Sequence, residues 1–346
     1  MVDFAGWEMP LFYSAILEEH QAVRRAAGLF DVSHMGRLRI AGPQAIDLVQ
    51  LAFTNDLSRL QPGRACYGLV CEPSGGVIDD VIVCRQADGC LMIPNSSNRM
   101  AVVDWIKALR EERRWEAQID DQTEALGMIA LQGPASLSIL NSMAADSMDG
   151  LRRFAFRRAA VGGTDCQVAR TGYTGEDGFE ILCPSDRALP LWEALMEAGQ
   201  AQGLRPAGLA ARDSLRIEAC LPLYGHELTR RTNPMFAGLE RFVKLDKGDF
   251  IGRQALLQAR MEETTPCLAA FEMTERAVPR QGCPIVRDGE TIGEVTSGLF
   301  SPTLKKGVGL AYIEARCAKP GTPISVQIRH KQFAAQVAER PLYRRG

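Results

Sequence analysis

The sequence predicts an α+β protein with more than one domain, and three observations support this. The chain has 346 residues, more than a single hydrophobic core usually organises. Helical and strand-like apolar patterns alternate as far as about residue 240. From residue 265 onward, short apolar stretches are separated by Gly, Pro and Asp, which is typical of a small all-β domain.

The first elements follow from local patterns. Residues 14–29 carry apolar side chains at helical spacing, with acids early and bases late, and Gly28 is expected to end this helix. The next patterns together predict an α+β unit over residues 37–125. They are a strand at 37–42, a helix at 42–53, three strands within 66–95 with turns at 73–76 and 88–89, and an amphipathic helix at 98–112.

A second α+β region begins at residue 127. It includes the helical stretches LPLWEALMEAGQAQGL, residues 189–204, and GLAARDSLRIEACLPLYGHE, residues 208–227. In the all-β part, the Asp288-Gly289 step between IVR and TIGEVT predicts a hairpin with a two-residue turn.

Composition and charge exclude several classes of protein. Hydrophobic residues make up 46% of the chain and charged residues 24%, as in ordinary soluble globular proteins. The net charge of -2 provides no general attraction for nucleic acid or an anionic membrane. No apolar run reaches the roughly twenty residues of a membrane span, and the N-terminus lacks the basic region of a signal peptide.

The ten cysteines form no C-x-x-C pair, so we expect reduced thiols and no metal site.

Two adjacent carboxylates, Asp79 and Asp80, stand in GGVIDDVIV where a half-buried strand is expected to begin. Successive side chains of a strand point to opposite faces, so the two cannot line one pocket as a pair of glycosidase carboxylates would. One is expected to face a cavity while the other caps or forms a salt bridge. Spacing alone favours a simpler interpretation, in which both close the turn at Gly75-Gly76.

Three further stretches carry candidate functional side chains. ARTGYTGEDGFEI ends with Glu180 between apolar neighbours, where a carboxylate is costly unless it meets a donor. The predicted helix at 208–227 could supply that donor from Arg212 or Arg216, although either could form a purely structural ion pair. GEVTSGLFSPTL is a turn-rich strand pair whose hydroxyls fit ordinary turn chemistry.

Taken together, the motifs resemble the glycine cleavage system T protein, or aminomethyltransferase, family. The resemblance covers nearly the whole chain. It rests, in order and spacing, on FAGWEMP, FDVSHMG, GGVIDD, ARTGYTGEDGFE, AARDSLRIEA, LPLYGHEL, NPMFAGLERFVKLDKGDFIGRQAL and VTSGLFSPTL.

The family's fold implies a three-domain cloverleaf of the α+β class. Residues 1–36 and 126–250 would form a discontinuous folate-binding α+β domain. Residues 37–125 would form an inserted ferredoxin-like domain, and residues 251–346 a C-terminal β-barrel-like domain.

The resemblance also implies a reaction and its partners. An aminomethyl group carried on the lipoyl arm of the H protein would be transferred to tetrahydrofolate as 5,10-methylenetetrahydrofolate, with release of ammonia. This chemistry needs a fixed negative group near a carbon that develops positive charge. The partners implied are tetrahydrofolate and the lipoyl H protein, met transiently by a monomer. The compartment is the cytoplasm, or the mitochondrial matrix in a eukaryote, although no transit peptide is visible.

Two carboxylates and an arginine match the family's central site residues. By this resemblance Asp80 is the catalytic aspartate, and Asp79 takes the structural role. Glu180 matches the pterin-binding glutamate, since a carboxylate can accept from the adjacent N–H donors of a pterin. Arg212 matches the arginine of this site, with Arg216 as the weaker candidate.

The remaining candidate residues have good structural interpretations as well. Tyr67 and Tyr173 are similar to site tyrosines that stack or hydrogen-bond, but a role in the core fits nearly as well. Asn95 matches a family asparagine and could equally cap the helix after it. His34 and His226 are expected to be structural, because the reaction demands no imidazole.

The sequence differs from the family pattern at two places, and it leaves alternative functions open. The chain starts at MVDFAGWEMP, where family members usually carry a short preceding segment, and PNSSN differs from the usual Asn-Ala-x-Asn form. Amine-oxidising relatives carry a flavin-binding G-x-G-x-x-G, which is not found here. Another folate-dependent demethylase or a non-catalytic folate-binding protein are the alternatives. Asp249 replaces the cysteine expected of a non-enzymatic relative used in iron-sulfur cluster maintenance.

Overall fold

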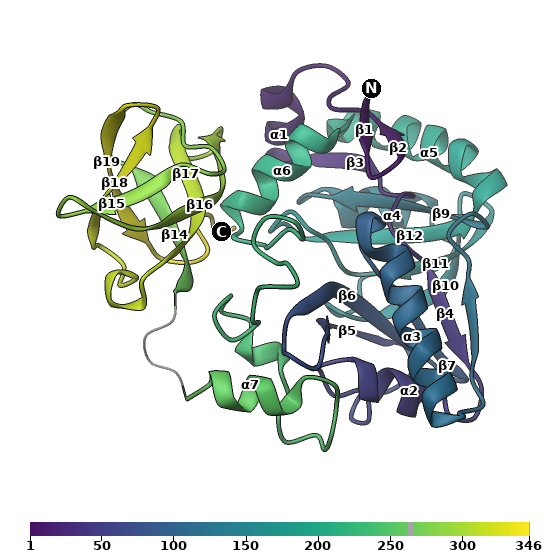
Figure 1. Cartoon of the computed structure of the whole chain (residues 1–346). Helices are drawn as coiled ribbons and strands as arrows, with labels where there is room; N and C mark the ends of the chain where they lie inside the picture. Colours follow the sequence, from purple (N-terminus) through teal and green to yellow (C-terminus); the bar gives the residue numbers. More distant parts are fainter. Residues whose placement is uncertain (262–265, 346) are drawn as a thin grey trace.

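The protein is built on three large sheets, one of them a closed barrel (Figure 1). The computed structural model describes residues 1–261 and 266–345, and residues 262–265 and 346 lie outside the described part. A small hairpin of β1 (Val2–Phe4) and β2 (Trp7–Met9) precedes the first large sheet in the chain. The α+β class and the three-part layout predicted from the sequence are confirmed.

The first sheet has six strands and lies between helices and the second sheet. Its strands are antiparallel except for one parallel pair, β3 with β13. Helices α4 (Ser136–Met143) and α5 (Ser185–Gly199), the latter followed by η2 (Gln200–Gln202), pack on one face. The strand order is β10 (Phe156–Val161), β11 (Thr164–Ala169), β12 (Gly178–Pro184), β9 (Leu126–Gln132), β3 (Ala27–Asp31) and β13 (Leu204–Pro206).

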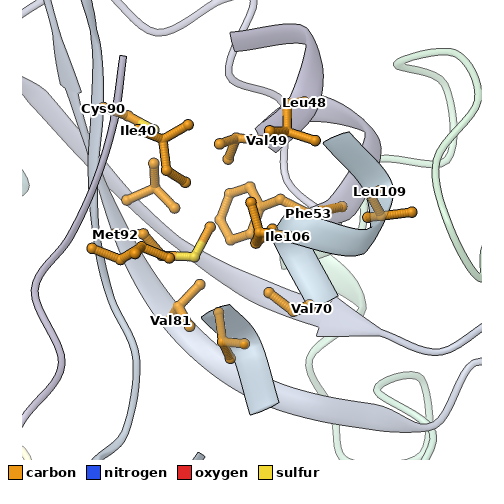
Figure 2. Packing of buried hydrophobic residues seen from close by; sticks show 14 of the residues in the cluster. Ile40, Leu48, Val49, Phe53, Val70, Val81, Cys90, Met92, Ile106 and Leu109 are labelled. Carbon is orange, nitrogen blue, oxygen red and sulfur yellow. The ribbon is translucent and has the colours of Figure 1, made fainter. Parts of the chain in front are cut away.

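The second sheet has five antiparallel strands and is covered on one face by α2 (Ala45–Ala52) and α3 (Arg99–Arg113), with η1 (Ser96–Asn98) before α3. Figure 2 shows Phe53 at the centre of this core, among side chains from both helices and from the sheet. The other face packs on the six-stranded sheet, together with residues of α1 (Ile16–Arg25) and α6 (Leu209–Glu218). The strand order is β5 (Arg64–Cys71), β6 (Val77–Gln86), β7 (Gly89–Ile93), β4 (Leu38–Ala41) and β8 (Gln118–Asp121).

The third unit is the closed barrel, which lies beside the two sheets in Figure 1. The expected hairpin at Asp288-Gly289 is confirmed, with φ of 52° and 85° at these residues, as a two-residue turn with both φ positive requires. A bulge between Val295 and Ser297 interrupts one strand pair. The barrel order is β14 (Cys267–Met273), β17 (Lys306–Ile313), β16 (Glu290–Ser301), β15 (Pro284–Arg287), β18 (Pro323–Ile328) and β19 (Lys331–Ala338), with η4 (Ala315–Cys317) after β17.

The chain between α6 and the barrel packs on the five-stranded sheet. This stretch contains η3 (Glu240–Phe242) and α7 (Arg253–Ala259), and Leu256 of α7 joins a buried cluster with Leu69 and Val77. The first barrel strand begins only at Cys267. The boundaries at 36/37, 125/126 and 250/251 stay a prediction, and we propose to move the last of them beyond α7 because of this packing.

The expected role of Gly28 was wrong. Helix α1 ends at Arg25, and Gly28 lies inside β3. A Cβ at Gly28 would come within 2.4 Å of Cγ2 of Val23. Glycine is therefore needed here for the close approach of the helix to the strand, and not for the end of the helix.

All ten cysteines are free thiols, and seven of them are buried. Burial raises the pKa of the Cys90 thiol to about 12, so this thiol stays protonated and packs as a small apolar group. The prediction of reduced, largely buried thiols is confirmed. No helix in the described part of the chain combines the length and apolar composition of a membrane span.

Replacing Phe53 by Ala should destabilise the five-stranded unit. The ring is fully buried, and such truncations cost about 3–5 kcal/mol of unfolding free energy through lost burial and the cavity left behind. Urea denaturation followed by tryptophan fluorescence would measure this, because Trp105 and Trp115 pack against the same cluster. Met100→Ala, at a side chain 59% exposed on α3, is the control and should change the transition little. Equal transitions in the two variants would contradict the assigned core.

Candidate active site

The adjacent carboxylates on β6 point to opposite faces, as the alternation of a strand predicts. In the pairing with β5, Asp79 lies opposite Val70 and Asp80 opposite Leu69. Val70 belongs to the core under α2 and α3. Leu69 belongs to the cluster that the 228–256 stretch covers. Asp79 is therefore directed toward the helices and Asp80 toward the region between the units.

Asp79 holds the segment after β7 in place. Its carboxylate is fully buried and accepts from the backbone N–H of Asn95 at 2.8 Å, from Asn95 Nδ2 at 2.8 Å and from Asn98 Nδ2 at 2.7 Å. Burial raises its pKa, and the charge of Asp80 raises it further. These contacts support the structural role expected of Asp79.

Asp80 is held by two donors. Tyr67 donates from its hydroxyl to Oδ2 at 3.0 Å, and Asn95 Nδ2 lies 2.9 Å from Oδ1. Burial raises the pKa of Asp80, whereas both hydrogen bonds stabilise its charged form and oppose that rise. Asn95 precedes η1 and makes no side-chain capping bond. Its side chain instead bridges the two carboxylates, so Asn95 does not cap the helix, and its role as a site residue stays a prediction.

The two tyrosines differ in their partners. The Tyr67 ring meets the Phe242 ring edge-on, with centroids 4.7 Å apart. The Tyr173 hydroxyl donates to the carbonyl oxygen of Pro222, and its ring lies under the Arg212 guanidinium, 4.6 Å from the guanidinium carbon. Burial raises the pKa of both phenols, and each phenol's pKa is raised further by Asp80. Both tyrosines therefore stay protonated donors on the Asp80 side of the site.

Glu180 and Arg212 influence each other but form no ion pair. Glu180 lies on β12 opposite Ala130 and accepts a hydrogen bond from Thr171. Burial raises its pKa, and the charge of Arg212 opposes this. Burial also lowers the pKa of Arg212. Within residues 1–261 and 266–345, neither a carboxylate nor a hydrogen-bond acceptor is recorded for the Arg212 guanidinium.

Arg216, the weaker candidate for the arginine of the site, is already paired. Its Nη1 donates to Glu227 at 2.7 Å, and its side chain is 1% exposed. His34 is buried, and burial lowers its pKa to about 3, so the imidazole is neutral. His226 lies with Nδ1 3.1 Å from the carbonyl oxygen of Thr296. These contacts fit the structural roles expected of the two histidines.

Some residues around the site were missed by the sequence analysis. Asn98 shares Asp79 with Asn95, and its place three residues further along PNSSN was an available signal. Thr171 donates to Glu180 from the other end of the glycine-rich stretch. Glu227 lies in LPLYGHEL, and its ion pair with Arg216 was not predicted. Nothing local in the sequence marks which hydroxyl or acid reaches which partner.

The site has the groups for binding an organic molecule with N–H donors and an electron-rich or anionic part. Glu180 offers a carboxylate and Asp80 a fixed negative charge. Arg212 offers a guanidinium whose donors meet no acceptor in the described part of the chain. No group of three or more His, Cys, Asp or Glu in the described residues is arranged to hold a metal ion. A separate cavity of about 650 Å³ lies between the two open sheets, next to Leu91 and Phe156, and is lined by none of the candidate residues.

Comparison with known proteins identifies the family. Residues 1–247 match the model of the GCVT N-terminal domain, and residues 267–344 match the glycine cleavage T-protein C-terminal barrel domain. The aminomethyltransferase of Desulforamulus reducens is 44% identical over 346 residues, covering 100% of this chain and 94% of that protein. The aminomethyltransferase of Bacillus subtilis is 43% identical over 99% of this chain and 95% of its own length.

A solved structure agrees with these matches over the whole fold. The glycine cleavage system aminomethyltransferase T from Bartonella henselae superimposes with a TM-score of 0.92 at 32% identity, covering 99% of this chain and 94% of that one. The likeness therefore includes the barrel as well as the two open sheets. This chain belongs to the glycine cleavage T-protein family.

Proposed function

We propose that this protein is the aminomethyltransferase of a glycine cleavage system and uses tetrahydrofolate as acceptor. The lipoyl H protein would deliver the substrate as an S-CH2-NH2 group. The C–S and C–N bonds break, and the carbon forms bonds to two folate nitrogens. The two protons that leave these nitrogens appear on the released ammonia and on the dihydrolipoyl sulfur, so atoms and charge balance.

The observation that carries the proposal is the half-buried Arg212 beside Glu180, which has no acid partner among the described residues. A cation without an acid partner and a carboxylate with one donor are costly in a folded protein unless a ligand completes them. A pterin fits this pair, because its edge of adjacent N–H groups can donate to Glu180 while an electron-rich part of the ring faces Arg212. Tetrahydrofolate supplies the nucleophilic amine of the reaction.

The protein's own groups then orient the reacting molecules and stabilise the charge that develops during the transfer. Asp80, held by Tyr67 and Asn95, keeps its carboxylate in one position and stabilises positive charge that develops on the transferred carbon. Tyr173 packs its ring against the Arg212 guanidinium, and the charge of Asp80 acts on its hydroxyl. The contacts position Asp80 before any substrate arrives, so little reorganisation is needed during the reaction.

We further propose that the protein works as a monomer in the cytoplasm and meets the H protein transiently. The match to bacterial relatives such as the Bacillus subtilis aminomethyltransferase supports the cytoplasmic location. The barrel and the two open sheets lie in one chain around the candidate residues, so no second copy is required to complete them.

Asp80→Asn should abolish turnover while leaving folate binding nearly unchanged. The amide removes the negative charge but keeps the shape, so kcat should fall about 100-fold or more. Ammonia and methylenetetrahydrofolate would be followed together, with tetrahydrofolate and aminomethylated H protein as substrates. Asp104→Asn on the exposed side of α3 is the control. Wild-type protein that binds folate without turnover would point to another one-carbon donor or to a binding protein.

Glu180→Gln should weaken binding of tetrahydrofolate by roughly 5- to 150-fold, which corresponds to about 1–3 kcal/mol for an unmatched buried polar group. The new amide N–H would face the N–H donors of the pterin. Titration calorimetry measures the affinity directly, without the H protein. Glu193→Gln, at an exposed carboxylate of α5, should bind like the wild type. Unchanged affinity in Glu180→Gln would remove Glu180 from the site.

The rate should fall in mildly acidic solution as Asp80 takes up a proton. Because burial raises the pKa of Asp80, the acid limb of kcat/KM should lie above the value of about 3.9 for a free aspartate. Tyr67→Phe removes a hydrogen bond that stabilises the carboxylate, so it should raise this pKa and move the acid limb to higher pH. Tyr13→Phe, at a ring 45% exposed and outside the candidate site, is the control and should leave the limb in place. A limb that moves to lower pH in Tyr67→Phe contradicts the assignment.

A further inference from the structure

The loop of residues 219–228, here called the junction loop, contacts all three units of the fold. The Tyr173 hydroxyl, from the unit of the six-stranded sheet, donates to its Pro222 carbonyl. Tyr224 of the loop donates to the Val77 carbonyl at the start of β6, 3.2 Å away. Tyr312 of the barrel donates to the Glu227 carbonyl at 2.9 Å. A shift of this loop would therefore move groups on both sides of the candidate site.

A buried ion pair anchors the junction loop. Glu227 is 0% exposed at its side chain and accepts from Arg216 Nη1 of α6 at 2.7 Å. Its Oε1 accepts from Thr296 Oγ1 at 2.6 Å, and the second Arg216 nitrogen, Nη2, donates to Ser297 Oγ at 2.7 Å. Thr296 and Ser297 lie at the bulge of β16. The bulge residues of β16 thus complete the hydrogen bonds of an ion pair between α6 and the junction loop.

We propose that Arg216 and Glu227 are positioning residues of the transfer reaction, which hold the junction loop on the barrel and fix opposite charges beside Tyr173 and Asp80. This inference rests on the proposed function and adds residues to the same site. Neither residue needs to touch the substrate. Their action passes through the loop to Tyr173, and through the Glu227 charge to Asp80.

The effect of the Glu227 charge on Asp80 can be measured, because few charged and titratable groups face Asp80. Asp79 lies beside it on β6, Tyr67 faces it from β5, Tyr173 from the glycine-rich stretch and Glu227 from the junction loop. Burial alone would raise the pKa of Glu227, but Arg216 and the hydroxyl donors hold it below its ordinary value. Glu227 is therefore ionised, and its negative charge raises the pKa of Asp80.

A second carboxylate of α6 provides a matched comparison. Glu218 is also buried and also binds barrel hydroxyls, with Ser301 Oγ at 2.5 Å and Thr303 Oγ1 at 2.9 Å. Its charged partner is Arg24 of α1 at 2.8 Å. Ser301→Ala therefore weakens the contact between α6 and the barrel without removing a charge beside Asp80.

The test compares Glu227→Gln, Arg216→Lys and Ser301→Ala with the wild type, each as the full chain with aminomethylated H protein and tetrahydrofolate. Glu227→Gln removes the negative charge that faces Asp80 from the junction loop, while Arg216 keeps Asp213 as a partner at 2.8 Å. The acid limb of kcat/KM should therefore move to lower pH by about half a unit or more. Arg216→Lys keeps the positive charge but cannot contact Glu227 and Ser297 at the same time. The acid limb of kcat/KM should therefore stay in place while kcat falls at least about fivefold. Ser301→Ala should lower the melting temperature with an unchanged limb.

Each outcome decides the proposal. An acid limb that moves in Glu227→Gln and stays in Ser301→Ala supports it, even where the two variants melt at equally reduced temperatures. Identical pH profiles in these two variants overturn it and leave Arg216 and Glu227 a purely structural pair. If Glu227→Gln does not fold, Ser297→Ala replaces it: it must lower kcat more than Ser301→Ala does, or the proposal fails. Wild-type protein without transfer activity contradicts the proposed function instead, so the two failures are distinct.

Discussion

The buried carboxylate of Asp79 is the constraint on which the candidate site depends. It accepts three N–H donors from the segment between β7 and α3, and removing any of them would leave a buried polar group unmatched. Because these bonds fix Asn95, the same amide is also placed against Asp80. The residue that carries the proposed chemistry is thus positioned by its neighbour on the strand, from the opposite face of the sheet.

The site divides its charges into paired and unpaired groups. Arg216 and Glu218 lie on α6 and are each bound to an opposite charge and to barrel hydroxyls. Arg212, one turn before Arg216 on the same helix, packs its guanidinium over the ring of Tyr173. A helix can present both kinds of arginine because residues four apart lie on one side and meet different neighbours along its length. The paired groups join the units of the fold, and Arg212 is the group proposed to meet a ligand.

Sequence reasoning succeeded where the physics is local. The alternation of a strand placed Asp79 and Asp80 on opposite faces, and the demand for positive φ located the hairpin at Asp288-Gly289. It failed where a contact between distant segments decided. Gly28 was expected to end α1, but the approach of Val23 to β3 is what requires it. The position of Asn95 fitted a cap as well as a site residue, and only its contacts with the two distant carboxylates excluded the cap.

The sequence by itself determined the α+β class, the all-β last part and, through motifs that resemble one family, the residues to examine. These follow from periodicity, turn chemistry and motif order, which are properties of short segments. Only the tertiary structure decided which arginine pairs with Glu227, which hydroxyls complete that pair, and that the 219–228 loop contacts all three units. Those facts depend on groups separated by as many as 147 residues, as between Tyr224 and Val77. No local pattern in the chain encodes such a distance, because it is set by the packing of whole sheets and helices against one another.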